Sequence, residues 1–466
     1  MKAKIKYIYP VFVLFLLLSA TVRANAEEKQ YFVRFKDEIA LFSMEEKEEY
    51  ILTEDELSEC LDAGIVEWYE EDFVVELFDD TESSDAESEE VPIKWDLELI
   101  NASMAKKIGC TGQTVRVGVI DSGIVKHPDL SDSILEGYNF LDNTEDVTDN
   151  KGHGTFVSGM ITANQNEQGI VGIAPKTKIV PLKCFDDGYE TYVSTIKSAI
   201  EAAVDIYDCD IINMSFGISS YSTKLEQAVK YAVDNGVIVI ASVGNGGGST
   251  LYYPAAYEEV IGVGSVDRDK NRSYFSQYNS SVFVTAPGEE VWSTNNEGGY
   301  SVKSGTSFSA PLVSGMVAVM KGIDEDITTD EVKEYLKLTS IVPGKETETV
   351  KEHDVQYGYG VIDVKGCIEK MMEGIDLFIS PIEKTNGETS VLIYNNTQNE
   401  FDGICLWGEY KKGYLKDLDW KDVIIPPGEG ITTESRLTDN TVRCFVWESI
   451  ADITAISNVR EMGVKR

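Results

Sequence analysis

The middle of the chain alternates apolar runs, which predict strands, with segments of helical periodicity. Most of the runs TVRVGVI, KIVPLKCF, DIINMSF, VIVIAS and VIGVGSV are too apolar to leave one face in water, which is typical of a parallel sheet covered on both faces. Between them, residues 191–207 and 222–236 place apolar side chains at helical spacing, and Gly236 stands where the second helix should end. This alternation predicts a doubly wound α/β domain with right-handed crossovers.

The segments before and after this region follow other patterns. Residues 27–80 predict a small α+β unit, with YFVRF as a strand, TEDELSECLDAG as a capped helix and IVEWYEEDFVVELF as two strands. Residues 81–90 are a polar acidic run, which is typical of an exposed linker and is a natural place for cleavage. After an α/β domain at 91–373, residues 374–466 predict a small β-sandwich that is either a binding module or a stabilising appendage.

The first residues have the pattern of a secretory signal. Three lysines precede an apolar run at residues 7–20, and residues 24–26, Ala-Asn-Ala, provide a small-residue cleavage site. The run is shorter than the roughly 20 apolar residues that a membrane-spanning helix needs. Arg23 interrupts the small residues, which leaves an uncleaved N-terminal anchor as the alternative. We expect residues 1–26 to be a signal peptide and the mature chain to be secreted, either free or at the cell surface.

Composition narrows the classes of partner. The 466 residues contain 80 acidic and 41 basic side chains, and this net charge of −39 has the wrong sign for a protein that neutralises phosphates. Nucleic acid is therefore excluded as the expected partner. The 7 cysteines form no CxxC pair. Neither a zinc cluster nor a dense disulfide scaffold is predicted, and one or two disulfides are left open.

Three short motifs fall where a doubly wound sheet places its chemistry, at the carboxyl ends of strands. Asp121 ends an apolar strand, His153 lies between glycines at the start of a helical segment, and Ser307 opens the apolar helix FSAPLVSGMVAVM. Each motif alone is usually only a turn or a helix start. Serine becomes a strong nucleophile when an imidazole takes its proton and a carboxylate orients that imidazole. Of the 3 histidines only His153 has this setting, since His127 precedes a proline in a loop and His353 lies in a charged stretch.

Taken together and in this order, the motifs make the sequence resemble the subtilase family of subtilisin-like serine proteases (peptidase S8 type). The matching runs are VIDSGI with HPDL, GHGTFVSG, GIAP, INMSFG, SVGN, APG and GTSFSAPLVSG. The resemblance implies that Asp121 orients the imidazole, His153 is the general base and Ser307 is the nucleophile. It also implies that Asn245 donates a hydrogen bond to the oxyanion of the tetrahedral intermediate.

The resemblance extends to the residues that bind the substrate. The runs SFGIS and ASVG would pair with an extended peptide as added strands. The expected substrate-binding residues are Ser215, Phe216, Gly217, Ser242, Gly244 and Tyr252. Tyr252 stands where relatives often have glycine near the floor of the specificity pocket. Its ring therefore predicts a shortened pocket and a preference for smaller residues at P1, the position on the acyl side of the cleaved bond.

A calcium site is the expected cofactor site. By resemblance, side-chain oxygens of Asp129 and Asn166 would join the backbone carbonyls of Asn164, Gln168 and Ile170. Mixed carbonyl and carboxylate ligands suit Ca²⁺ better than zinc. The alternative is an ordinary polar surface loop.

The sequence thus predicts a secreted serine endopeptidase that hydrolyses peptide bonds through an Asp-His-Ser triad and an acyl-enzyme intermediate. We expect it to be made as a self-processing zymogen. Its expected partners are protein or peptide substrates and its own pro-region, which would act as an intramolecular inhibitor. The mature form is expected to be a monomer without a membrane span. Two alternatives are a catalytically silent subtilase-like binding partner and a dedicated processor of one peptide precursor.

Overall fold

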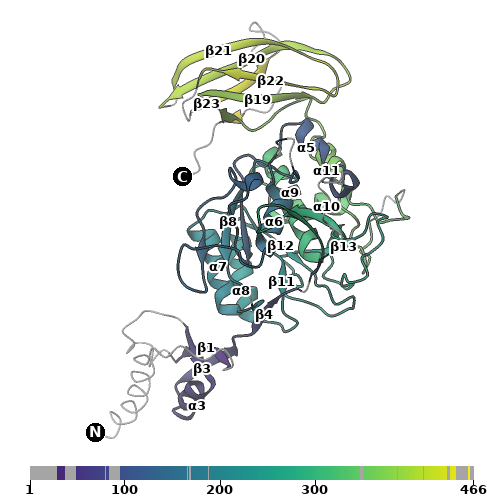
Figure 1. Ribbon diagram of the computed structural model, residues 1–466. Coiled ribbons are helices and arrows are strands. Elements are labelled where there is room, and N and C mark those ends of the chain that lie inside the picture. The colour runs from purple at the N-terminus through teal and green to yellow at the C-terminus, as the bar shows by residue number, and fades with distance from the viewer. Residues whose placement is uncertain are drawn as a thin grey trace.

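Three units follow one another along the chain in the computed structural model (Figure 1). The structure describes residues 29–36, 49–78, 80–82, 95–164, 166, 169–186, 188–346, 351–385, 387–412, 414–437, 441–447 and 460–461. The expected signal peptide lies outside the described residues, as does most of the acidic linker. The units are a small N-terminal α+β unit, a large α/β unit and an all-β unit.

The α/β unit is built on a seven-stranded parallel sheet with the strand order β14-β13-β12-β10-β6-β8-β7. Its strands are β6 (Arg116–Asp121), β7 (Tyr138–Asn139), β8 (Lys178–Lys183), β10 (Ile211–Met214), β12 (Ile238–Ser242), β13 (Ile261–Val266) and β14 (Val284–Pro287). From β6 the chain extends the sheet first toward β8 and then, on the other side, toward β10. Strand order therefore reverses beside β6, and this point is where open α/β sheets bind ligands.

Helices cover both faces of this sheet, which confirms the predicted doubly wound architecture. Helices α6 (His153–Thr162) and α9 (Thr306–Ile323) share one apolar core, and α7 (Val193–Asp205) and α8 (Thr223–Asp234) share the other. Successive strand residues alternate between the two cores: Ile211 belongs to the first and Ile212 to the second. Both faces are buried, which explains why the strands are apolar throughout.

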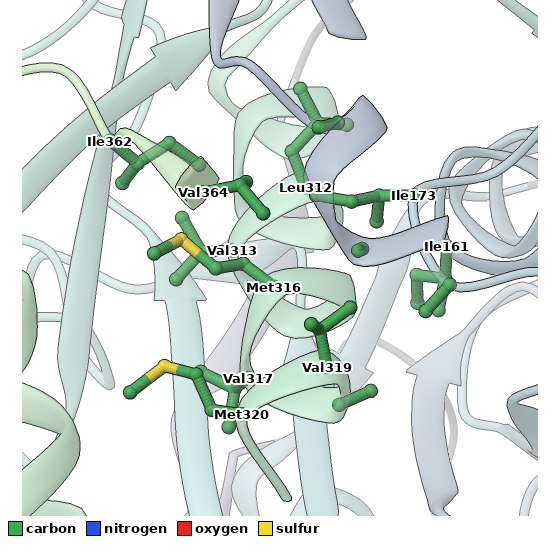
Figure 2. Close-up of a cluster of buried hydrophobic side chains, with 14 of the residues drawn as sticks. Ile161, Ile173, Leu312, Val313, Met316, Val317, Val319, Met320, Ile362 and Val364 are labelled. Atoms are coloured by element: carbon green, nitrogen blue, oxygen red, sulfur yellow. The ribbon is translucent and has the colours of Figure 1, made fainter. Parts of the chain in front are cut away.

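Helix α9 runs through the centre of the larger core. Figure 2 shows Ile161 and Ile173 on one side of it and Ile362 and Val364 on the other. All of its residues are buried, including Lys321 near its end. Within the described residues, α9 is the one helix long and apolar enough to cross a membrane, and 94% of that stretch is buried inside the protein.

Shorter helices complete the α/β unit. They are α4 (Trp95–Leu99), α5 (Ser103–Lys107), the 3-10 turn η1 (Pro128–Leu130), α10 (Thr329–Thr339) and α11 (Val364–Met371). The start of α10 carries a capping box, in which Thr328 and Glu331 satisfy each other's backbone N–H groups.

The N-terminal unit has the predicted α+β elements, but its last predicted strand pairs with strands of the α/β unit. Strands β1 (Gln30–Phe35), β2 (Tyr50–Thr53) and β3 (Val66–Glu71) form a sheet beside the capped helix α3 (Glu54–Asp62). Strand β4 (Val74–Leu77), the second strand predicted within IVEWYEEDFVVELF, pairs with β11 (Phe216–Gly217) and β9 (Glu190–Tyr192) of the α/β unit. A further strand, β5 (Thr81–Glu82), pairs with β16 (Tyr300–Ser304), whose other neighbour is β15 (Val291–Thr294).

The C-terminal unit is a β-sandwich, as predicted. One sheet contains β17 (Leu377–Ile379), β18 (Glu383–Thr385), β19 (Glu388–Asn395) and β22 (Gly430–Ser435); the other contains β20 (Phe401–Lys411), β21 (Tyr414–Ile425), β23 (Val442–Trp447) and β24 (Arg460–Glu461). Ile393 of the first sheet and Trp407 of the second belong to one buried core. All seven cysteines are buried thiols, and the sulfur atoms of Cys405 and Cys444 lie 3.4 Å apart in this core.

Candidate active site

An aspartate and a histidine meet at the carboxyl end of the central strand β6. Asp121 is the last residue of β6, and His153 is the first residue of α6. Nδ1 of His153 lies 2.7 Å from Oδ1 of Asp121, and both side chains are buried. This contact orients the imidazole so that its other nitrogen, Nε2, is turned away from β6. The two predicted residues are therefore brought together as a carboxylate–imidazole pair.

Asp149, which the sequence analysis did not identify, holds the start of α6 in place. Its Oδ1 accepts hydrogen bonds from the Gly152 N–H at 2.7 Å and the Ser122 hydroxyl at 2.8 Å. Its Oδ2 accepts two more from the N–H and hydroxyl of Thr155. A buried carboxylate thus satisfies the N-terminal donors of the helix that carries His153. The available signal was an aspartate shortly before an apolar helix.

Ser307 lies in the first turn of α9, at the same end of the sheet. Its hydroxyl donates to the backbone oxygen of Ser215 at 3.4 Å, while the Ser215 hydroxyl donates to the Ser307 carbonyl at 2.9 Å. The ring of the next residue, Phe308, lies 5.6 Å from the imidazole ring of His153, centroid to centroid. The residue that follows the predicted nucleophile therefore lies close to the predicted base.

Asn245 follows β12 and contacts Thr306, the residue before Ser307. Its Oδ1 accepts hydrogen bonds from the backbone N–H of Thr306 at 2.8 Å and from its hydroxyl at 2.7 Å. These two bonds leave Nδ2 pointing toward the catalytic group, where it donates to Oδ1 of Asp80 at 3.3 Å. The amide is thus oriented in advance for a negatively charged oxygen.

Asp80, from the segment after β4, occupies the space between these groups. Its Oδ2 lies 3.0 Å from Nε2 of His153, and its side chain is only 9% exposed. Burial lowers the pKa of His153, but the carboxylates of Asp121 and Asp80 outweigh burial and raise this pKa to about 10. An imidazolium has no free lone pair for the proton of Ser307.

One family of known proteins matches most of the α/β unit that carries this site. The family model described as the subtilase family matches residues 112–360, which is more than half of the chain. The chain belongs to the subtilase family.

Named relatives agree with this assignment. Subtilisin Savinase of Lederbergia lenta is 34% identical over 275 residues, which are 59% of this chain and 98% of the relative. M-protease of Shouchella clausii (strain KSM-K16) is 34% identical over 313 residues, 66% of this chain and 81% of the relative. Minor extracellular protease Epr of Bacillus subtilis (strain 168) is 36% identical over 295 residues, 63% of this chain and 44% of the relative. This subtilase is a serine endopeptidase.

In this subtilase, strand β4 lies as an extended segment between strands β11 and β9 of the α/β unit. Leu77 and Glu76 pair with Phe216 and Gly217 of β11, the run at which a bound peptide is expected to add a strand. The second expected edge, 241–244, requires correction. Its first residues belong to β12 and pair with β13, and Ser242 is fully buried. Among the described residues β4 pairs on its other side with β9, where a three-residue strand gave no sequence signal.

Phe78 lies against Tyr252, the residue expected to close the specificity pocket. Their rings meet edge to face with centroids 5.2 Å apart, and Phe78 is buried. A Cβ atom at Gly217 would lie 2.7 Å from the Phe78 ring, and a Cβ at Gly244 would lie 3.0 Å from the Tyr252 ring. The two glycines therefore make room for aromatic rings. Tyr252 is thus one wall of a site that holds the phenyl ring of Phe78, and the preference for smaller residues at P1 stays a prediction.

The expected calcium residues are only partly described. Asp129 is buried; its Oδ1 accepts from Nδ2 of Asn166 at 2.8 Å and its Oδ2 from the hydroxyl of Tyr300 at 2.7 Å. The Asn164 N–H donates to the Asp129 carbonyl at 2.8 Å. Ile170 is buried nearby in sequence, and Gln168 lies outside the described residues. Within the described residues, no three His, Cys, Asp or Glu side chains form a metal cluster.

Proposed function

We propose that this subtilase cleaves peptide bonds through an acyl-enzyme formed on Ser307. The buried 2.7 Å contact between Asp121 and His153 carries the proposal, because it is the arrangement that makes an imidazole a general base. Once Asp80 has left, Nε2 of His153 takes the hydroxyl proton as Ser307 attacks the carbonyl carbon.

The remaining groups of the site stabilise the oxyanion and protonate the leaving group. The oxyanion meets Nδ2 of Asn245 and the N-terminal end of α9, both of which favour negative charge. His153 then gives its proton to the departing amine, and water repeats the sequence on the acyl-enzyme. Peptide substrates add a strand beside β11, as β4 does in the precursor.

Replacement of the nucleophile tests this proposal. Ser307→Ala should abolish both peptide hydrolysis and labelling by a fluorophosphonate probe, since the probe reacts only with an activated serine. Ser198→Ala, a matched change at an exposed position of α7, should alter neither. Labelling that persists in Ser307→Ala would identify a different nucleophile. A mature wild-type chain that is never labelled would favour the catalytically silent alternative.

We further infer that the chain is an exported zymogen. Residues 1–26 would be the signal peptide, 27–80 the inhibitory pro-region, 81–90 the acidic linker, 91–373 the catalytic domain and 374–466 the accessory domain. The apolar run at the N-terminus supports export, and so does the similarity to a relative named as extracellular. The mature enzyme would be a monomer that acts on proteins or peptides outside the cell.

Self-processing is proposed to occur close to Phe78. Strand β4 lies along β11, and Phe78 fills the site beside Tyr252, so this part of the chain is presented like a substrate. After removal of the signal, Ser307→Ala should remain full length, whereas the wild-type chain should gain a new N-terminus near residue 79. N-terminal sequencing from a protease-free host measures this. The same new terminus in both proteins would exclude self-cleavage.

A structural Ca²⁺ ion is proposed at Asp129. The buried carboxylate and the neighbouring Asn166 amide fit a hard cation once the amide turns its oxygen toward Asp129. The carbonyls of Asn164, Gln168 and Ile170 would add further oxygens, and the bound ion would tie this loop to η1. Excess Ca²⁺ should raise the melting temperature relative to a strong chelator. The Asp129→Asn variant, which lacks the carboxylate, is the control and should not show this difference. Equal melting temperatures of the wild-type protein in Ca²⁺ and in chelator would favour the ordinary polar loop instead.

A further inference from the structure

The segment that crosses the catalytic group is held on both sides by strand pairing. Before it, β4 pairs with β11 and β9. After it, Thr81 and Glu82 of β5 pair with Ser304 and Lys303 of β16. Asp80 lies between these two anchored strands, so its position is set by the backbone on either side.

The Asp80 carboxylate fills the position where the chemistry takes place. One oxygen lies 3.0 Å from Nε2 of His153, and the other accepts from Nδ2 of Asn245 at 3.3 Å. A Cβ atom added to Gly305, two residues before Ser307, would lie 2.2 Å from Oδ1 of Asp80. The carboxylate therefore sits directly against the N-terminal end of α9.

We propose that the catalytic centre is a carboxylate-binding site, and that Asp80 fills it in the precursor and keeps the precursor latent. The proposal rests on the proposed roles of Ser307 and His153. Both groups that hold the carboxylate are needed for catalysis, because His153 must accept a proton and Asn245 must meet the oxyanion. With Asp80 in place neither is available, and the Ser307 hydroxyl donates to Ser215 instead. The ligand of this site is a side-chain carboxylate carried on an extended peptide.

The contact between the Asp80 carboxylate and the His153 imidazole is stabilised by charge as well as by close fit. A carboxylate on each side of the imidazole favours the imidazolium, which in turn attracts the carboxylate of Asp80. The pair is buried, so its attraction is weakly screened by water and salt. Asparagine has nearly the shape of aspartate without its charge. Asp80→Asn therefore separates the ionic contact from simple occupation of the space.

Departure of Asp80 must precede the first cleavage. The reactive form is the fraction of precursor in which the carboxylate is out of the site, and the rate of any reaction at Ser307 is reduced by that fraction. Weakening the contact should therefore speed both the reaction with a small probe and self-processing.

The test compares full-length precursors that carry Asp80, Asp80→Asn or Asp80→Ala. Both variants should be labelled by a fluorophosphonate roughly tenfold faster or more before cleavage, and they should mature faster. The matched control is Glu59→Gln, which removes an exposed carboxylate from helix α3 of the N-terminal unit and should leave both rates unchanged. If variant precursors are labelled no faster than wild type while the mature wild-type enzyme is labelled readily, the latch is refuted and the proposed function stands. Failure of the mature enzyme to be labelled would instead remove the proposed function.

A second measurement does not depend on activity. The chain has only 3 histidines, so isotope-labelled His153 can be followed by NMR in the uncleaved Ser307→Ala precursor. Its imidazole should remain protonated at neutral pH, and Asp80→Asn should lower its pKa by roughly one unit or more. Glu59→Gln should leave the pKa unchanged. A His153 pKa that does not respond to Asp80→Asn in a folded precursor would overturn the proposal.

Discussion

Single polar atoms set the direction of each group around Ser307. The amide of Asn245 is oriented by two hydrogen bonds from Thr306 to its oxygen, which leaves its nitrogen for the substrate side. The imidazole of His153 is oriented in the same way by Asp121, and the helix beneath it by Asp149. Groups that are oriented beforehand need no reorganisation when charge develops, which is the main source of their catalytic effect.

Asn245→Ala tests this orientation in the mature enzyme. We expect kcat to fall by about 10² to 10³ with little change in KM, because the amide meets charge that exists only in the transition state. Thr306→Ser, which keeps the hydroxyl donor, is the control and should stay close to wild type. Steady-state kinetics on a short peptide measures both constants. A raised KM with unchanged kcat would show that Asn245 binds the ground state instead.

Asp72 makes the stability of the precursor depend on pH. Burial raises the pKa of Asp72 to about 6, although hydrogen bonds from Ser194 act to lower it. Because this folded-state pKa lies above the unfolded value of 3.8, the folded precursor binds more protons between these pH values. Its free energy of unfolding therefore falls as pH rises through that window.

Asp72→Asn should remove this dependence. Relative to the uncleaved Ser307→Ala precursor, the variant should gain up to about 3 kcal/mol as pH rises from 4 to 7. Thermal unfolding at several pH values measures the difference, with Asp55→Asn in the first turn of α3 as an exposed control. Parallel pH profiles for Asp72→Asn and its parent would contradict the assignment.

At the scale of secondary-structure elements, the close packing of α9 against its neighbours limits which residues fit in the larger core. The helix begins one residue before Ser307 and continues through the larger core, so its packing also positions Ser307. Gly315 lies where α9 passes Ile173, and a Cβ atom there would lie 1.8 Å from Cγ2 of Ile173. Only a residue without a side chain fits at this distance.

Gly315→Ala should therefore destabilise the protein by about 1–3 kcal/mol through overpacking. Ile173→Ala opens space at the same point, so adding Gly315→Ala to that background should cost less. Urea unfolding of the two single variants and the double variant gives the coupling energy. Strictly additive effects would show that the helix does not contact Ile173 in solution.

At the scale of the whole molecule, the sandwich is docked on the side of the protease away from strand β4 (Figure 1). Phe378 and Tyr394 of its first sheet belong to the core that surrounds α9. Glu383 accepts a hydrogen bond from Gln113 at 2.7 Å and pairs with Lys176 at 2.9 Å. The described residues of the sandwich contribute no group to the site around Ser307.

Truncation after Glu373 should leave kcat/KM for a short peptide within several-fold of the full-length value. The melting temperature should fall, because the apolar surface under Phe378 becomes exposed. Phe378→Ala in the full-length chain is the matched control and should lower the melting temperature by less. Complete loss of short-peptide turnover in a truncated protein that is demonstrably folded would refute the division into protease and accessory unit.

The sequence alone was sufficient for the features that depend on local pattern. Strands buried on both faces are apolar throughout, and helices α7 and α8 carry one apolar face, so the doubly wound unit could be predicted. The proposed catalytic residues Asp121, His153 and Ser307 stand at strand ends and helix starts, where short motifs can be recognised. The capping box of α3 and the alternation of the sandwich strands are local signals of the same kind.

Only the tertiary structure decided which distant segments meet. Strand β4 could be predicted as a strand from the sequence, but its partners could not. It pairs with β9 and β11, because an unpaired strand edge of the protease is available to it. Asp80 stands at the start of an acidic run, and no local pattern distinguishes it from the neighbouring carboxylates. Its role comes from the three-dimensional position that β4 and β5 impose, next to the buried imidazole of His153.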